Sequence, residues 1–243
     1  MSEQYNESTY GDRVAEIYDN WYSEASPQMV ARLKELAGGG PVLELGIGTG
    51  RVALPLREQG LEVHGIDASE AMVARLRAKP GGALIPVTIG NFAELGVSES
   101  YSLIFVVFNT FFALSSQEAQ VECFANVARQ LRPGGLFLIE AFVPDQTRFT
   151  RGQIVQANKV GVNEVRMEVS QHDPLNQRTT SQLVVITEHG IELYPVQVRY
   201  AWPSELDLMA RLAGMRLRER WSNWKREPFT SESTRPISVW EKT

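Results

Sequence analysis

The sequence of 243 residues is poor in the residues that form disulfides and zinc sites. It contains one cysteine, Cys123, which excludes an internal disulfide and fits a reducing compartment. Its three histidines, His64, His172 and His189, are widely scattered, so together with the cysteine they do not give the spacing of a zinc site. We therefore expect no metal centre.

Long apolar runs and clusters of basic residues are absent as well. The longest apolar runs, such as LIFVVF at residues 103–108, are far too short to cross a bilayer. The polar start, MSEQYNESTYGDR, lacks the pattern of a signal peptide. The formal net charge is −5 and no Lys/Arg cluster occurs, which argues against binding to nucleic acid. We expect a cytoplasmic protein that binds neither membranes nor nucleic acid.

Strand-like and helix-like segments alternate from residue 41 to residue 143, which predicts right-handed crossovers and a parallel sheet. The strand-like segments are residues 41–46, 61–67, 83–90, 101–109 and 136–142, and the helix-like segments between them are residues 51–60, 69–79 and 116–131, the last ended by a turn at RPGG. Two helices precede the sheet, at residues 10–22 and 26–37. We expect Ser26 and Ser69 to cap the helices that they begin.

The pattern changes after Pro144. Residues 163–171, 181–187 and 192–202 alternate between apolar and polar side chains without intervening helices, and predict an antiparallel meander of three strands. A helix at residues 204–214, capped by Ser204, and two closing strands at residues 215–221 and 236–242 complete the chain. The fold class is α/β, with a doubly wound, mostly parallel Rossmann-like sheet of about seven strands. It has an antiparallel C-terminal ending and an inserted antiparallel β meander.

The segment VLELGIGTGR, residues 42–51, places Gly46, Gly48 and Gly50 directly after a strand. Glycines at such a turn let backbone N–H groups and a helix N-terminus approach a ligand without a Cβ in the way. In an open α/β sheet the ligand crevice lies beyond the carboxyl ends of the strands. Asp67 ends the next strand, where its carboxylate can accept hydrogen bonds from both hydroxyls of a ribose. The sequence therefore predicts a nucleoside site.

The glycine spacing indicates which nucleoside is favoured. Dinucleotide-binding proteins use G-x-G-x-x-G, whereas Arg51 stands here where the third glycine would be. Glu44, two residues before Gly46, suits a cationic ligand better than a pyrophosphate. A nicotinamide-dependent reductase is the first alternative function, and both Arg51 and the antiparallel ending argue against it.

Several segments, taken in order, resemble the class I S-adenosylmethionine-dependent methyltransferases. VLELGIGTGR resembles their first motif, GIDASEAMV their ribose motif, and RQLRPGGLFLIEAF the loop and fifth strand that follow. YGDRVAEIYDNWY, residues 10–22, is similar to the lid helix of small-molecule methyltransferases. The resemblance covers roughly residues 10–143, and the closing segments from residue 205 onward are similar too.

The resemblance implies S-adenosylmethionine as the cofactor and S-adenosylhomocysteine as its product. The cofactor residues that it implies are Tyr10, Tyr18, Glu44, Gly46, Gly48, Gly50, Asp67, Ala68, Met72, Asn91, Phe92, Phe108 and Asn109. Glu44, Gly46 and Gly48 would surround the methionine end, with the ammonium reached through water near Glu44. Asp67 would hold the ribose, and residues 68, 72, 91 and 92 would surround the adenine. Phe108 and Asn109 would lie near the sulfonium, under a lid closed by both tyrosines.

Each assignment has a structural alternative. The glycines form a tight turn with or without a ligand, and Asp67 is also suited to cap the helix that follows it. The lid tyrosines and the aromatic residues after the fourth strand are equally suited to plain packing. His172 and His189 lie in or beside expected turns, where exposed histidines are common.

Methyl transfer from a sulfonium is an in-line displacement, which requires alignment and exclusion of water more than covalent catalysis. Related aminosugar N-methyltransferases carry a histidine shortly after the fourth strand, but Ala113 stands at the matching place, so no catalytic residue is assigned. The proline-containing motif of nucleic-acid amino methyltransferases is also missing from FNTF at residues 108–111. We expect methylation of an N or O nucleophile of a small molecule in secondary metabolism. A non-catalytic S-adenosylmethionine-binding protein is the second alternative, supported by Ala113 alone.

Three parts of the chain are expected. Residues 1–144 form the cofactor-binding core with its lid, residues 145–203 form an inserted subdomain for the substrate or for a second subunit, and residues 204–243 complete the core. Candidate substrate residues, chosen by type, are Phe112, His172, Tyr194, Arg199, Tyr200 and Trp202. We expect a monomer or a homodimer.

Overall fold

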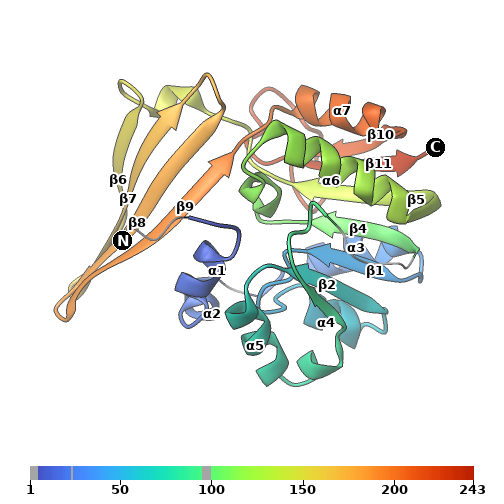
Figure 1. Ribbon diagram of the computed structural model, residues 1–243, viewed down its shortest axis with the longest axis horizontal. Helices are drawn as coiled ribbons and strands as arrows, with labels where there is room; N and C mark the ends of the chain where they lie inside the picture. The colour runs from blue at the N-terminus through green and yellow to red at the C-terminus, as the bar shows by residue number, and fades with distance from the viewer. Residues whose placement is uncertain (1–4, 23, 95–99) are drawn as a thin grey trace.

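The computed structural model describes residues 5–22, 24–94 and 100–243 and contains two β-sheets. The larger sheet has seven strands in the order β10-β11-β5-β4-β1-β2-β3 (Figure 1). Its strands are β1 Val42–Leu45, β2 Val63–Asp67, β3 Val87–Ile89, β4 Tyr101–Val106, β5 Leu131–Glu140, β10 Met215–Trp221 and β11 Ile237–Lys242. Strands β1 to β5 pair in parallel, whereas β11 pairs antiparallel with β5 and β10. The predicted fold class is confirmed.

Helices pack on both faces of this sheet. They are α3 Pro27–Ala37, α4 Ala53–Glu58, α5 Glu70–Ala78, α6 Gln117–Gln130 and α7 Pro203–Leu212, with short 3₁₀ turns η1 Gly82–Leu84, η2 Thr110–Ala113 and η3 Gln146–Arg148. Ile104 of β4 packs in one core cluster with Phe124 of α6, and Leu103 packs in the other with Leu33 of α3. The burial of β4 on both faces explains its nearly continuous apolar sequence. Among the described residues, no helix combines the length and the apolar character that crossing a membrane requires.

Local signals set the starts of several helices. The Ser26 hydroxyl accepts a hydrogen bond from the Met29 amide at 3.2 Å, and the Ser69 hydroxyl accepts one from the Met72 amide at 3.1 Å, so both predicted caps are confirmed. Helix α7 begins at Pro203 rather than after a Ser204 cap, because proline is preorganised for the first helical position. The predicted RPGG turn lies within β5, whose pairing with β4 has a register irregularity there.

The single lid helix predicted at residues 10–22 is wrong. The structure divides it into α1 Thr9–Val14 and α2 Tyr18–Trp21. The Ile17 amide donates to the Val14 carbonyl at 3.0 Å, a tight turn that interrupts the α-helical pattern. The break lets α1 pack on α5 and β9, while Tyr18 of α2 reaches Arg51.

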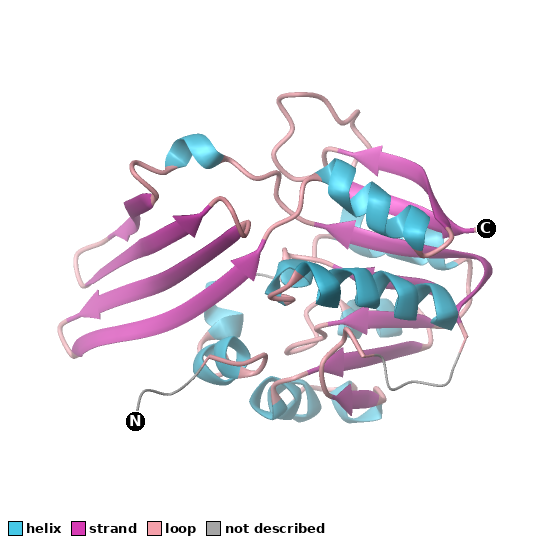
Figure 2. Ribbon diagram, turned by 45° about the horizontal axis from the view of Figure 1, so that its top comes forward, coloured by secondary structure: helices cyan, strands magenta, loops and turns pink. Residues whose placement is uncertain are grey.

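The meander has four strands instead of the three predicted. They are β6 Gln153–Val160, β7 Glu164–Asp173, β8 Arg178–Thr187 and β9 Gly190–Arg199, antiparallel in chain order. Strand β6 was missed because it is an edge strand whose side chains are mostly exposed, so its apolar alternation is weak. Figures 1 and 2 show this sheet beside the larger one, with α1 and α2 near β9.

A buried ion pair connects the end of the meander to the core. Arg199 lies 2.6 Å from Glu205 of α7, and the two side chains are only 6% and 16% exposed. Arg199 also donates to the side-chain oxygen of Gln120 in α6 at 2.5 Å. Because burial of an unpaired charge is costly, this pair fixes how β9 meets α6 and α7.

We predict that Arg199→Met lowers the free energy of unfolding by about 3 kcal/mol, because Glu205 then keeps a charge without its ionic partner. Urea denaturation followed by circular dichroism measures the change. Arg216→Met is the matched control, since Arg216 is 70% exposed in its pair with Glu241 and its loss should cost less than about 1 kcal/mol. Equal losses for the two variants would contradict the structural role of Arg199.

Candidate functional site

The glycine turn after β1 uses its three glycines in different ways. All have positive φ: +72° at Gly46, +55° at Gly48 and +81° at Gly50. A Cβ on Gly46 would collide with the Thr110 side chain, and a Cβ on Gly50 would collide with Leu76. A Cβ on Gly48 would meet only the Met72 methyl, at an ordinary 3.5 Å. Gly46 and Gly50 therefore allow close packing within the chain, whereas at Gly48 the chain leaves room for a ligand.

Asp67, at the end of β2, is tied to this turn. Its carboxylate accepts a hydrogen bond from the Gly48 amide at 2.7 Å and another from the Ser69 amide at 2.9 Å. Ser69, not Asp67, provides the side-chain cap of α5. Burial raises the pKa of the Asp67 carboxyl. Each carboxylate oxygen retains acceptor capacity, as contact with a ribose diol requires.

Glu44 is a buried carboxyl group with an unsatisfied atom. It is 3% exposed, and among the described residues its Oε2 atom has no hydrogen-bond partner. Burial, followed by repulsion from Asp67, raises the pKa of Glu44 well above its ordinary value. A cationic or N–H-bearing ligand beside Oε2 would stabilise the ionised form.

The lid is held over the turn by polar contacts. The Ser69 hydroxyl donates to Asp12 of α1 at 2.6 Å. Asp19 of α2 accepts from the Thr49 hydroxyl at 2.6 Å and lies 2.8 Å from the Lys79 ammonium. No local sequence signal marks these aspartates, because the contacts join segments that are far apart in the chain.

Aromatic rings surround the Arg51 guanidinium beside the turn. Its carbon lies 4.3 Å from the ring centroid of Phe108, 5.4 Å from that of Tyr22 and 5.6 Å from that of Tyr18. Arg51 also donates to the Tyr18 hydroxyl at 3.3 Å. Tyr10 joins the group through a 3.3 Å contact between its hydroxyl and that of Tyr22, and burial raises the pKa of Tyr10, which stays neutral. The rings therefore stabilise the positive charge of Arg51 itself.

The end of β4 is held in an unusual conformation. Phe108 and Asn109 both have positive φ, 56° and 67°, which is uncommon for residues other than glycine. Glu140 of β5 accepts from the Phe108 amide at 3.2 Å and from the Trp224 indole at 3.0 Å. Glu140 therefore positions Phe108 against Arg51. Sequence reasoning missed Glu140, since only its place at a strand tip marked it.

The residues expected around an adenine are mixed in their exposure. Met72 and Phe92 are buried, at 5% and 8% exposed. The Asn91 side-chain oxygen accepts from the Ala93 amide at 2.8 Å. Ala68 follows Asp67 directly and is half-buried.

Among the candidate substrate residues, only His172 and Tyr200 lie together. The His172 Nε2 atom is 2.8 Å from the Tyr200 hydroxyl, and the His172 ring stacks on Phe149 at a centroid distance of 4.5 Å. Tyr194 packs edge-on against Trp21 of the lid. Phe112 is fully buried, Arg199 is held in its ion pair, and Trp202 precedes α7 at 38% exposed.

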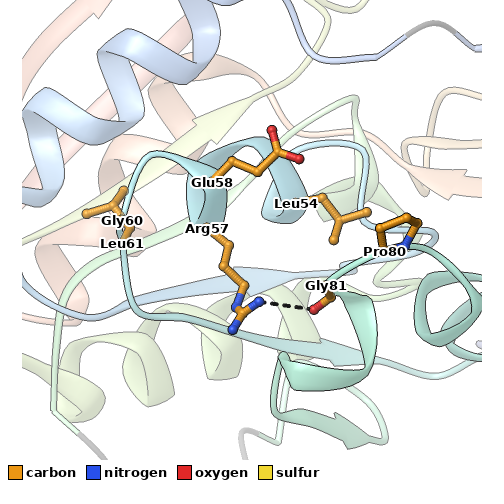
Figure 3. A pocket seen from close by; sticks show the side chains of 7 residues that line it. All are labelled: Leu54, Arg57, Glu58, Gly60, Leu61, Pro80 and Gly81. Carbon is orange, nitrogen blue, oxygen red and sulfur yellow. Dashed lines mark hydrogen bonds between the residues drawn. The ribbon is translucent and has the colours of Figure 1, made fainter.

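Two cavities lie away from the glycine turn. One, of about 310 Å³, is lined by Leu54, Arg57, Glu58, Gly60, Leu61, Pro80 and Gly81 (Figure 3). Arg57 partly spans it by donating to the Gly81 carbonyl at 3.2 Å. The other, of about 340 Å³, lies at one end of the meander between Gln153, Gln171 and Thr180. Neither contains the polar groups of the strand tips.

Comparisons with known proteins agree with this geometry. Residues 42–135 match the model of a methyltransferase domain. The CcbJ methyltransferase from Streptomyces caelestis is 40% identical, with a TM-score of 0.91 over 98% of this chain and 100% of that one. The cypemycin N-terminal methyltransferase of a Streptomyces species is 27% identical over 97% of this chain and 98% of its own. CalS10, a SAM-bound amino pentose methyltransferase from Micromonospora echinaspora, shares the fold at 17% identity, with a TM-score of 0.69 over the whole of both chains.

The chain belongs to the class I S-adenosylmethionine-dependent methyltransferases. It is an enzyme that uses S-adenosylmethionine as its methyl donor. The site fits this cofactor, because the unsatisfied oxygen of Glu44 suits an ammonium and the space at Gly48 admits a ligand against the backbone. The reductase and the non-catalytic binder have no support in the comparisons.

We predict that Glu44→Gln separates stability from cofactor affinity. The pKa of Glu44 is higher in the folded than in the unfolded protein, so the protonated carboxyl group favours folding. This contribution to stability is lost as the pH rises from the pKa in the unfolded protein, about 4.5, through the pKa in the folded protein. The variant should therefore be at least as stable as the wild type at pH 7, with the advantage vanishing near pH 4. Its affinity for S-adenosylmethionine should fall by about 1–3 kcal/mol, because a charge-assisted contact is lost.

Urea titrations over this pH range and calorimetric titration with S-adenosylmethionine measure the two effects. A variant that binds the cofactor with wild-type affinity would disprove the assignment of Glu44 to the ammonium.

Proposed function

We propose that this enzyme methylates an amine nitrogen of a small molecule in secondary metabolism. The observation that carries the proposal is the acidic character of the strand tips, where the carboxyl groups of Glu44, Asp67 and Glu140 lie beside the glycine turn and Phe108. An amine that gains a methyl group acquires positive charge as the new bond forms, so acidic surroundings favour a nitrogen acceptor over an oxygen acceptor. Two relatives support this class, since one is an N-terminal methyltransferase and the other an amino pentose methyltransferase.

In this proposal the cofactor site consists of the residues expected from the sequence. S-adenosylmethionine supplies an activated methyl group. Glu44 holds the ammonium, Asp67 holds the ribose hydroxyls, and the backbone at Gly46, Gly48 and Gly50 lines the methionine end. The adenine contacts are assigned to Ala68, Met72, Asn91 and Phe92, and the remaining contacts to Tyr10, Tyr18, Phe108 and Asn109. The buried hydroxyl of Tyr10 and the aspartate contacts of the lid help to exclude water.

We propose residues 145–203 as the acceptor subdomain between the two parts of the core, residues 1–144 and 204–243. His172 is the proton acceptor in this subdomain. Ala113 cannot accept a proton, but β9 packs against η2, which contains Ala113, and Tyr200 follows β9 directly. Tyr200, the hydrogen-bond partner of His172, shares a core cluster with Phe111 and Phe112 of this turn. An ammonium acceptor must lose a proton before its nitrogen can attack the methyl group, and His172 would accept that proton.

The proposed acceptor is neither a nucleic acid nor a membrane component. The net charge of −5 opposes a polyanion. The carboxyl groups of Glu44, Asp67 and Glu140 are likewise suited to a small amine rather than to a phosphate backbone. We also propose that the enzyme acts in the cytoplasm, where S-adenosylmethionine is available.

We predict methyl transfer to small primary or secondary amines and none to the matched alcohols. Purified enzyme is incubated with S-adenosylmethionine and paired amine and alcohol panels, and mass spectrometry detects addition of one methyl group. Asp67→Ala is the control, because it should weaken cofactor binding by about 1–3 kcal/mol and slow turnover at low cofactor concentration. Methylation of alcohols alone would disprove the nitrogen assignment.

We further predict that His172→Gln lowers kcat about a hundredfold at pH 7 with little change in the KM for S-adenosylmethionine. Activity should recover as the pH rises, because the amine then loses its proton without help. His189→Gln is the control, since that histidine side chain is 87% exposed. A loss at His172 that is independent of pH would indicate a structural role instead.

A further inference from the structure

The two faces of the meander differ in what covers them. Leu183, Val185 and Tyr194 point toward the lid and pack with residues such as Val14. Arg166 of β7 lies on the same side, with its guanidinium carbon 4.9 Å from the Trp21 ring centroid. Because side chains alternate along a strand, the residues between these positions point away from the lid.

The face that points away from the lid is apolar over three adjacent cross-strand rows. The rows are Val155, Val169, Gln182 and Pro195; Ala157, Met167, Val184 and Leu193; and Val160, Val165, Ile186 and Ile191. We call these residues the outer face. Exposure reaches 70% at Val155, 66% at Ile191 and 54% at Leu193. Within these described rows no side chain is charged, although a solvated face of an antiparallel sheet ordinarily carries polar residues.

Gln182 is the single polar residue of the outer face, and it lies on β8, between β7 and β9. Its Oε1 atom is buried and has no hydrogen-bond partner among the described residues. An unsatisfied amide in an apolar surface is unfavourable in an isolated chain. Two such amides that meet across an interface can rotate and exchange N–H···O bonds.

We propose that the outer face is the contact surface of a twofold dimer, with β8 and Gln182 near the axis. A second copy is the favoured occupant, because an uncharged apolar patch is complementary to an identical patch, packed at about 10 Å. The apolar rows span about 19 by 17 Å, or about 320 Å², taking about 4.8 Å between strands and 3.3 Å per residue. The rest of this side of the sheet carries Gln171 and Thr180 and then Asp173 and Arg178, which would form a polar rim around the apolar centre. Centre and rim together cover about 630 Å², which is of the order of the roughly 800 Å² per partner in stable complexes.

The pairing is isologous, so each outer-face residue contacts the corresponding face of its partner. The charged residues Glu164, Arg166 and Glu168 alternate with Val165, Met167 and Val169 along β7, so they point to the opposite side and are not buried by the pairing. The dimer thus covers apolar surface without desolvating an ion pair. The side of the sheet that packs on the lid takes no part in the pairing.

We predict that the wild-type protein is a dimer in sedimentation velocity at micromolar concentration. Leu193→Glu should weaken the dimer by about a hundredfold or more, because it buries an unpaired charge. Leu212→Glu is the matched control, since Leu212 is a leucine on α7 that is 77% exposed and lies off the outer face. A monomeric wild type, or equal dissociation by both variants, overturns the proposal, and a monomer would assign the face to a different partner.

A cysteine at the proposed axis tests the geometry directly. Cys123 is fully buried, so Gln182→Cys introduces an accessible thiol into a chain that otherwise has none available. Mild oxidation should link two copies through residue 182, as non-reducing electrophoresis detects, and leave Leu212→Cys unlinked. Absence of the 182 link, or equal linkage at residue 212, overturns the proposed axis.

Discussion

The unsatisfied carboxyl group of Glu44 is the constraint on which the rest of the site depends. It is buried at the end of β1, and its neighbour at the end of β2, Asp67, carries the same charge. Two carboxyl groups at adjacent strand tips are unfavourable until a cation or a set of donors arrives. The fold tolerates the arrangement because the surrounding core is extensive on both faces of the sheet. In the proposed site, the ammonium of S-adenosylmethionine would lie beside Glu44 and would offset this electrostatic cost.

The lid is attached by apolar packing as well as by polar contacts. Asp12 and Asp19 form hydrogen bonds with Ser69 and Thr49, and the ion pairs Asp19–Lys79 and Glu16–Arg75 are partly exposed. Exposed ion pairs contribute little free energy, so the apolar packing of the fully buried Val14 with Met72 of α5 contributes more to the attachment. The short helices α1 and α2 have few internal hydrogen bonds and therefore depend on these contacts. Tyr18 and Tyr22 lie against Arg51, which couples the lid to the glycine turn.

The sequence was informative where local chemistry decides the structure. Alternating strands and helices predicted the sheet, and the Ser26 and Ser69 caps were visible from residue type and position. It failed where tertiary contacts decide: the break in the lid, the edge strand β6 and the ring set around Arg51 have no local signal. From the sequence alone, Arg51 could be interpreted only as the residue that replaces the third glycine of a dinucleotide-binding motif. Its aromatic partners lie in segments that are distant along the chain. The roles of individual cofactor and substrate residues stay predictions, since strand-tip position narrows a role without establishing it.

The meander links the site to the proposed dimer because it is a single layer. The lid packs on one face, and among the described rows of the other face no helix or strand provides support. An apolar sheet face that stays in water forgoes the free energy that its burial would contribute. Pairing with a second copy converts it into a two-layer structure with a dry centre, which makes it a firmer platform for α1 and for the His172–Tyr200 pair. Assembly and acceptor binding are then supported by opposite faces of the same four strands, so a substitution on the outer face can weaken catalysis without touching the active site.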